Sequence, residues 1–128
     1  MATEGLVMLD LLNHIAANGF DTGGQTPIGL RFTAIDFRSP GAIRDVIYTR
    51  RSAYLGVWLY KGDDVAPLNW RGKPSGGVAG GHCIVPYRFS ARGFGDATWG
   101  RTVDSDDEWL ASRCDEAFSL EWLQQVAA

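Results

Sequence analysis

Residues 80–100 read GGHCIVPYRFSARGFGDATWG, and this segment holds the clearest structural signal in the chain. Its aromatic and aliphatic residues form two runs, His82 to Phe89 and Phe94 to Trp99, on either side of the turn residues Ala91-Arg92-Gly93. Runs of this kind, bounded by glycine and other turn residues, predict two consecutive β-strands. The segment therefore predicts a β-sheet in the second half of the chain.

Other segments add strands to this pair. Residues Ala53 to Tyr60, AYLGVWLY, are almost continuously apolar and short, which is typical of a strand covered on both faces. From Leu30 to Phe37 apolar and polar residues alternate, with one interruption of the alternation near the middle, and this pattern also predicts a strand. Ala117 to Trp122 fits two alternatives, a last strand or the continuation of a preceding helix.

Three segments carry helix signals. The first helix is expected from Glu4 to Asn18, with Thr3 as its N-cap. Ser39-Pro40 places a capping serine before a proline suited to the first helical turn. Ser105 and Glu108 have the spacing of a capping box and predict a short third helix.

The order of these elements predicts an α+β fold with an antiparallel sheet and two to three helices. The 128 residues fit one domain, 1–128. Gly62 to Gly81 is the longest stretch with no regular pattern, and loops of that length are usually functional. Within it, Trp70 lies between the turn residues Asn69 and Gly72, so we expect it to be exposed and to anchor a partner.

Composition excludes several classes of protein. Hydrophobic residues make up 45% of the chain, too many for disorder, and no apolar run is long enough for a membrane span. The net charge of −3 lacks the basic excess of a dedicated nucleic-acid binder, so no nucleic-acid partner is expected. Two cysteines make no disulfide framework, and no signal peptide is recognisable, which predicts a cytoplasmic protein.

Gly80-Gly81-His82, followed by Ala97-Thr98-Trp99-Gly100 after the next turn, resembles the C-terminal half of the papain-like cysteine peptidases. In that family a Gly-Gly-His opens the strand of the catalytic histidine, and Asn-Ser-Trp-Gly follows. The region from Asp104 to Trp122 resembles a subset found in phage and bacterial proteins. The resemblance implies a truncated papain-like fold and a relict catalytic role for His82.

Two of the three catalytic roles that the resemblance implies have no residue here. No cysteine precedes His82, and Ala97 stands where the orienting asparagine belongs. Cys83 adjoins His82, and successive strand residues project to opposite faces, so the two cannot form a dyad. Cys114 is expected to be a small buried hydrophobe. Asp96 and Thr98 point to the face opposite Ala97, so neither is expected to take its place.

His82 itself has two interpretations, a relict catalytic imidazole beside a groove or a half-buried strand residue bonded to a neighbouring carbonyl. The histidines and cysteines show no metal-ligand spacing, and no metal or other cofactor is expected. Two charged clusters are candidate binding surfaces: an acidic one of Asp104, Asp106, Asp107 and Glu108, and a basic one that includes Arg50 and Arg51. Helix-dipole interactions and a solvated helix face are the simpler explanations for these clusters.

These observations favour a non-catalytic papain-like protein that binds a host or phage protein. The phage resemblance suggests a counter-defence inhibitor of the anti-CRISPR type. One alternative is a peptidase-like hydrolase that uses His82 with a cysteine from a rearranged site or another chain. Another is a phage structural component. The apolar first helix also suggests a homodimer.

Overall fold

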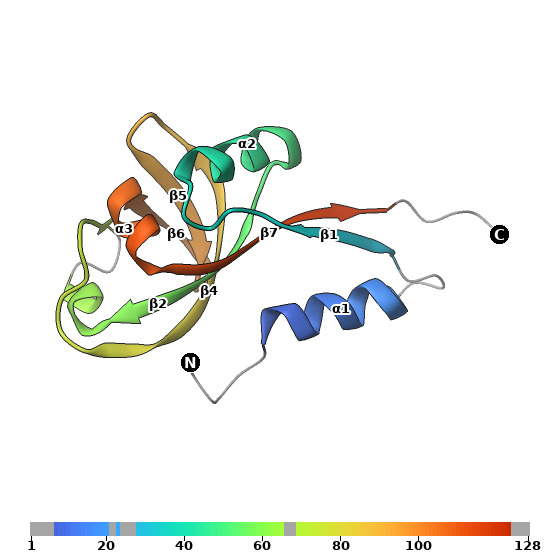
Figure 1. Cartoon of the computed structure of the whole chain (residues 1–128), viewed down its shortest axis with the longest axis horizontal. Helices are drawn as coiled ribbons and strands as arrows, with labels where there is room; N and C mark the ends of the chain where they lie inside the picture. Colours follow the sequence, from blue (N-terminus) through green and yellow to red (C-terminus); the bar gives the residue numbers. More distant parts are fainter. Residues whose placement is uncertain (1–6, 21–22, 24–27, 66–68, 124–128) are drawn as a thin grey trace.

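The computed structural model describes residues 7–20, 23, 28–65 and 69–123. A seven-stranded sheet forms its framework, in the order β1-β7-β2-β4-β5-β6-β3 (Figure 1). All neighbouring strands pair antiparallel except β3 and β6, which are parallel. The strands are β1 Leu30–Ala34, β2 Tyr54–Tyr60, β3 Asn69–Trp70, β4 Val78–Phe89, β5 Gly93–Thr98, β6 Arg101–Asp106 and β7 Cys114–Trp122.

Three α-helices and one short 3-10 helix accompany the sheet. They are α1 Met8–Asn18, α2 Pro40–Arg50, α3 Asp107–Arg113 and the 3-10 helix η1 Lys61–Val65. This architecture confirms the predicted α+β class with an antiparallel sheet. None of the helices in the described ranges is both long enough and apolar enough to span a membrane.

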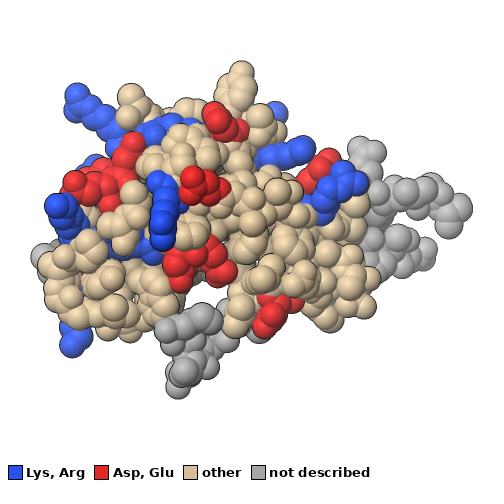
Figure 2. Space-filling view, in the orientation of Figure 1, with Lys and Arg blue, Asp and Glu red and all other residues tan. Residues whose placement is uncertain are grey.

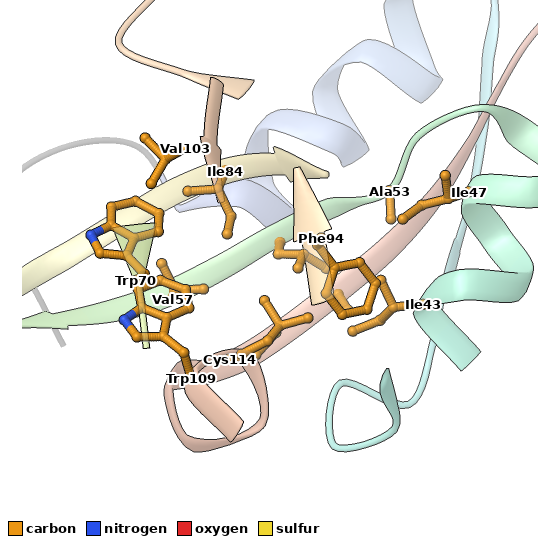
Figure 3. Packing of buried hydrophobic residues seen from close by; sticks show 13 residues of the cluster. Ile43, Ile47, Ala53, Val57, Trp70, Ile84, Phe94, Val103, Trp109 and Cys114 are labelled. Carbon is orange, nitrogen blue, oxygen red and sulfur yellow. The ribbon is translucent and has the colours of Figure 1, made fainter. Parts of the chain in front are cut away.

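The main core lies between one face of the sheet and helices α2 and α3. Ile43 and Ile47 of α2 and Trp109 of α3 pack with sheet residues that include Val57 and Ile84 (Figure 3). Trp70 and Trp109 stack face to face at its edge, with ring centroids 4.3 Å apart. Because both indoles are almost fully buried, this pair joins the short strand β3 to α3 through apolar contact.

A second, smaller core holds α1 against the ends of β1 and β7. Leu12 and Ile15 of α1 pack with sheet residues that include Phe118. Figure 1 shows this helix beside the β1–β7 ribbon, apart from α2 and α3. Leu9 and Leu11 remain exposed. The predicted homodimer stays a prediction, and the exposed leucines give it a physical basis.

The predicted helix starts differ in accuracy. Ser39 caps α2 as expected, because its hydroxyl accepts a hydrogen bond from the Ala42 amide at 3.1 Å. Helix α1 has Val7 at its N-cap position, and the proposed cap Thr3 lies outside the described residues. The predicted capping role of Ser105 is wrong, because Asp106 caps α3 by accepting from the Trp109 amide at 2.8 Å.

The strands of the C-terminal half also differ from the prediction. Strand β6 was not anticipated, and Ser105 belongs to it. The stretch from Gly62 to Gly81 is not irregular throughout, since it contains parts of η1 and β4 and all of β3. The segment after α3 is the strand β7, which decides between the two alternatives for Ala117 to Trp122.

A buried ion pair ties η1 to α3. The Arg113 guanidinium donates to both oxygens of the Asp63 carboxylate, at 2.8 and 3.0 Å. The Trp109 indole and the Tyr60 amide donate to the same carboxylate. Burial alone would raise the pKa of Asp63, but these hydrogen bonds and the guanidinium charge bring the pKa below its ordinary value. Arg113 also donates to the Gly72 carbonyl at 2.8 Å, so the loop after β3 is held as well.

We expect Asp63→Ala to lower the free energy of unfolding by about 3–5 kcal/mol, because it leaves the Arg113 guanidinium buried without its partner. Chemical denaturation measures this loss. Glu121→Ala is the control, since the ion pairs that its carboxylate makes with described residues are exposed, and we expect a loss of about 1 kcal/mol or less. Equal losses in both variants would contradict the role given to the buried pair.

Candidate functional site around His82

His82 lies near the middle of β4 on the face of the sheet that carries the main core. Its direct neighbour on β2 is Val57, and Val57 is also the neighbour of Cys114 on β7. The His82 side chain is half-buried, and this burial lowers its pKa below the usual value for histidine. A neutral imidazole therefore predominates at pH 7.

The imidazole is hydrogen-bonded to Thr98 at the end of β5. His82 Nε2 and Thr98 Oγ1 are 2.6 Å apart. In the β4–β5 register Asp96 pairs with Pro86, so Thr98 and His82 lie on the same face while Ala97 pairs with Val85 on the other. The predicted opposite orientation of Thr98 and Ala97 is confirmed, but the imidazole lies on the same face as Thr98. Thr98 therefore contacts it as a diagonal neighbour, a contact that was not predicted from the sequence.

Trp99 covers the same imidazole from the turn between β5 and β6. Its ring stacks on His82 with centroids 4.6 Å apart and also meets Trp70 edge to face at 5.9 Å. Trp99 and Gly100 both have positive φ, which makes a two-residue turn of the type that suits a β-hairpin. A bulky residue in this conformation is strained, and 55% of Trp99 is exposed.

Trp70 does not have the position expected from the sequence. Only 2% of it is exposed, and it lies between Trp99 and Trp109. The prediction that Trp70 is an exposed anchor is therefore wrong. Of the three tryptophans in contact here, Trp70, Trp99 and Trp109, the exposed one is Trp99. The Trp99-Gly100 dipeptide in the sequence could have indicated this position, because it forms the tip of a hairpin. Without β6 in the prediction, that dipeptide was not recognised as a turn.

Neither thiol faces His82. Cys83 projects to the opposite face of β4, where it is exposed; partial desolvation and the charge of Glu116 raise its pKa. Cys114 is buried, and its Sγ donates to the Glu116 carbonyl at 3.2 Å. Burial raises the pKa of Cys114 to about 12. Two strand spacings, about 9.5 Å, separate the backbones at Cys114 and His82, and Val57 stands between them.

The arrangement can support a hydroxyl–imidazole pair but lacks the rest of a nucleophilic site. Thr98 is within hydrogen-bond reach of a base, as a nucleophile must be, yet it is buried. Among the described residues, no side chain bonds to the second ring nitrogen, Nδ1, to orient the imidazole. No three histidine, cysteine or acidic side chains in the described ranges come together as a candidate metal site.

The acidic residues at the start of α3 are mostly engaged in local contacts. Asp106 is the N-cap and also accepts from the Gly72 amide. Asp107 forms an ion pair with Arg44 at 2.6 Å, and Asp104 forms one with Arg88 at 3.3 Å. Glu108 is exposed.

The basic cluster is engaged only in part. Arg50 contacts Glu121 at 3.5 Å, and Arg51 is the exposed left-handed C-cap of α2. Figure 2 shows acidic and basic side chains interspersed on the face that it draws, without one dominant field. The binding roles proposed for both clusters stay predictions.

Asp96 is a buried carboxyl group close to the site. Its Oδ2 accepts from the Ser105 hydroxyl at 2.6 Å, while Oδ1 has no hydrogen-bond partner among the described residues. Burial raises the pKa of Asp96 to about 7, despite the hydrogen bond from Ser105. The carboxyl group is therefore partly protonated at neutral pH.

Comparison with known proteins identifies the fold. No family model matches this sequence, and no curated protein matches it either. Among solved structures, the chain is similar to xylellain, a cysteine protease from Xylella fastidiosa, with a TM-score of 0.63. The fold resembles part of a papain-like cysteine protease. The match covers 77% of this chain and 41% of xylellain, at 11% sequence identity, so it shows the shared fold alone.

We expect the two cysteines of the native protein to react differently with a thiol reagent such as Ellman's reagent. One thiol, Cys83, should react slowly because its pKa is raised, and Cys114 should react only after denaturation. Counting the thiols that react at pH 8, with and without denaturant, measures this. Cys83→Ser should abolish the native signal; rapid native reaction of Cys114 would contradict the burial of that thiol.

The raised pKa of Asp96 predicts a pH-dependent stability. The folded state binds the Asp96 proton more tightly than the unfolded state does. Protonation of Asp96 therefore contributes its full share to the free energy of unfolding below pH 3.8, the pKa of the unfolded state, and this contribution is lost as the pH rises through about 7. Asp96→Asn should remove this loss. The melting temperature of the variant minus that of the wild type should therefore increase from about pH 5 to about pH 8. The same difference for the exposed control Asp45→Asn should show no such increase. A constant difference across this range would contradict the assignment.

Proposed function

We propose that this chain is a non-catalytic protein with papain-like architecture that acts by binding another protein. The observation that carries the proposal is the surroundings of His82. Its Nε2 is bonded to Thr98, Trp99 covers its ring, and both thiols of the chain point elsewhere or lie behind Val57. Without a thiolate beside the imidazole, cysteine-peptidase chemistry has no nucleophile.

The same surroundings suit protein binding. Trp99 is exposed, yet its ring is held by the His82 stack and by the edge of Trp70. A large aromatic side chain that is ordered before binding loses little conformational entropy in the complex. Tryptophan is also one of the residue types that most often dominate the energy of an interface. We therefore place the centre of the binding surface at Trp99.

The binding proposal predicts a specific loss in Trp99→Asn. Asparagine tolerates the positive φ of this turn position, so the hairpin keeps its conformation while the ring is removed. Against a partner that co-purifies with the wild-type protein, we expect binding at least about thirtyfold weaker, as for a dominant interface residue. Calorimetry with the purified partner measures the change.

Trp122→Thr is the matched control, because Trp122 is also exposed but lies at the end of β7. We expect it to bind as the wild type does. Equal binding by Trp99→Asn and the wild type would refute the assignment of the surface.

The absence of catalysis has its own test. We expect no turnover of a peptide library, and we expect thiol labelling by an activity probe to be unchanged in His82→Ala. Turnover that requires His82 together with Cys83 or Cys114 would establish the hydrolase alternative. Turnover that is lost in Thr98→Val would instead point to the hydroxyl–imidazole pair.

A finer form of the binding proposal is a counter-defence inhibitor of the anti-CRISPR type, and it rests on the resemblance to phage proteins. Its test is co-purification with candidate defence complexes and a plaque assay after deletion of the gene. Unchanged phage growth together with no bound host complex would refute it and leave the broader binding proposal standing.

A further inference from the structure

A solvent-open cavity of about 450 Å³ lies where the β4–β5 hairpin meets β6 and the end of β3. Arginines come to it from three separate segments: Arg71 follows β3, Arg88 lies on β4, and Arg92 lies in the hairpin turn. Its volume falls within the range of small-molecule sites. The cavity is separate from the His82 site, and the proposed function does not use it.

The cavity is basic although the chain as a whole is acidic. Asp104 is the one acidic residue among those that line it, and it pairs with Arg88 at 3.3 Å. Within the described ranges, the guanidinium groups of Arg71 and Arg92 have no hydrogen-bond or ion-pair partner. Three positive charges against one negative charge leave the lining with a net charge of +2. This charge suits a dianionic ligand.

The position of Arg88 depends on the glycine beneath it. In the β4–β5 and β5–β6 registers Arg88, Gly95 and Asp104 form a row across three strands. A Cβ atom at Gly95 would lie 2.3 Å from Arg88 Nε, so only glycine lets this side chain lie across β5. Arg88 thus lies over β5 and contacts Asp104 beside the cavity before any ligand binds.

The cavity has room for more than an anion. Its volume is much larger than an inorganic phosphate ion requires, so an organic group fits beside the phosphate. Guanidinium groups match the oxygen geometry of phosphate.

We propose that this cavity binds a phosphomonoester dianion, a nucleoside monophosphate being one example of the class. Arg71 and Arg92 bind the phosphate, and Arg88 adds a third donor. This inference is independent of the proposed protein-binding function, so either can fail without the other.

The test uses the full chain and three probes: adenosine 5′-monophosphate, inorganic phosphate and adenosine. By calorimetry at low salt we expect saturable binding of the monophosphate with a Kd below about 1 mM, and binding at least about tenfold weaker for the other two probes. Arg71→Gln and Arg92→Gln should each weaken binding about tenfold or more, since each removes a charge-assisted hydrogen bond.

Arg38→Gln and Arg31→Gln are the matched controls, because both arginines are exposed and neither lines the cavity. They should leave the affinity unchanged. The proposal is overturned if the monophosphate does not bind, if adenosine or phosphate binds as tightly, or if the control variants weaken binding as much as the cavity variants do. Circular dichroism of each variant confirms that a loss of affinity reflects the removed charge and not unfolding.

Discussion

The buried ion pair between Asp63 and Arg113 is the constraint on which this end of the molecule depends. Arg113 comes from the last turn of α3, which precedes β7, and Asp63 comes from η1, which follows the neighbouring strand β2. Both charges are removed from water, so each needs the other and the surrounding donors. The pair fixes α3 over the core, and the bond from Arg113 to the Gly72 carbonyl fixes the loop after β3.

The candidate site follows from that constraint. With α3 fixed, Trp109 supports Trp70, Trp70 supports Trp99, and Trp99 covers His82. These ring contacts explain how the Trp99 side chain can be exposed to solvent and still be held in one position. They also stabilise a turn conformation that is unfavourable for a bulky residue. The His82 imidazole is engaged within the fold, because its Nε2 contacts Thr98 and its ring face contacts Trp99. In this fold, which is similar to part of a cysteine protease, a threonine and a tryptophan surround His82.

Local signals in the sequence were accurate where the neighbouring residues determine the structure. The Ser39-Pro40 pair marked the start of α2, and the apolar run ending at Tyr60 marked β2. Errors arose where a strand needs a partner from elsewhere. Strand β6 has the sequence Arg101–Asp106, RTVDSD, whose polar composition hides it until it pairs with β5 and β3. Because this strand was not predicted, Ser105 was assigned as the cap of α3 and Trp70 was predicted to be exposed.

The sequence by itself determined the α+β class, the resemblance around Gly80-Gly81-His82, and the opposite orientation of His82 and Cys83, because strand alternation is a local property. Only the tertiary structure decided which hydroxyl meets the imidazole, because the β4–β5 register brings Thr98 diagonally next to His82. It also decided which charges are paired. Asp63 and Arg113 are 50 residues apart, and their contact depends on the packing of α3 against η1.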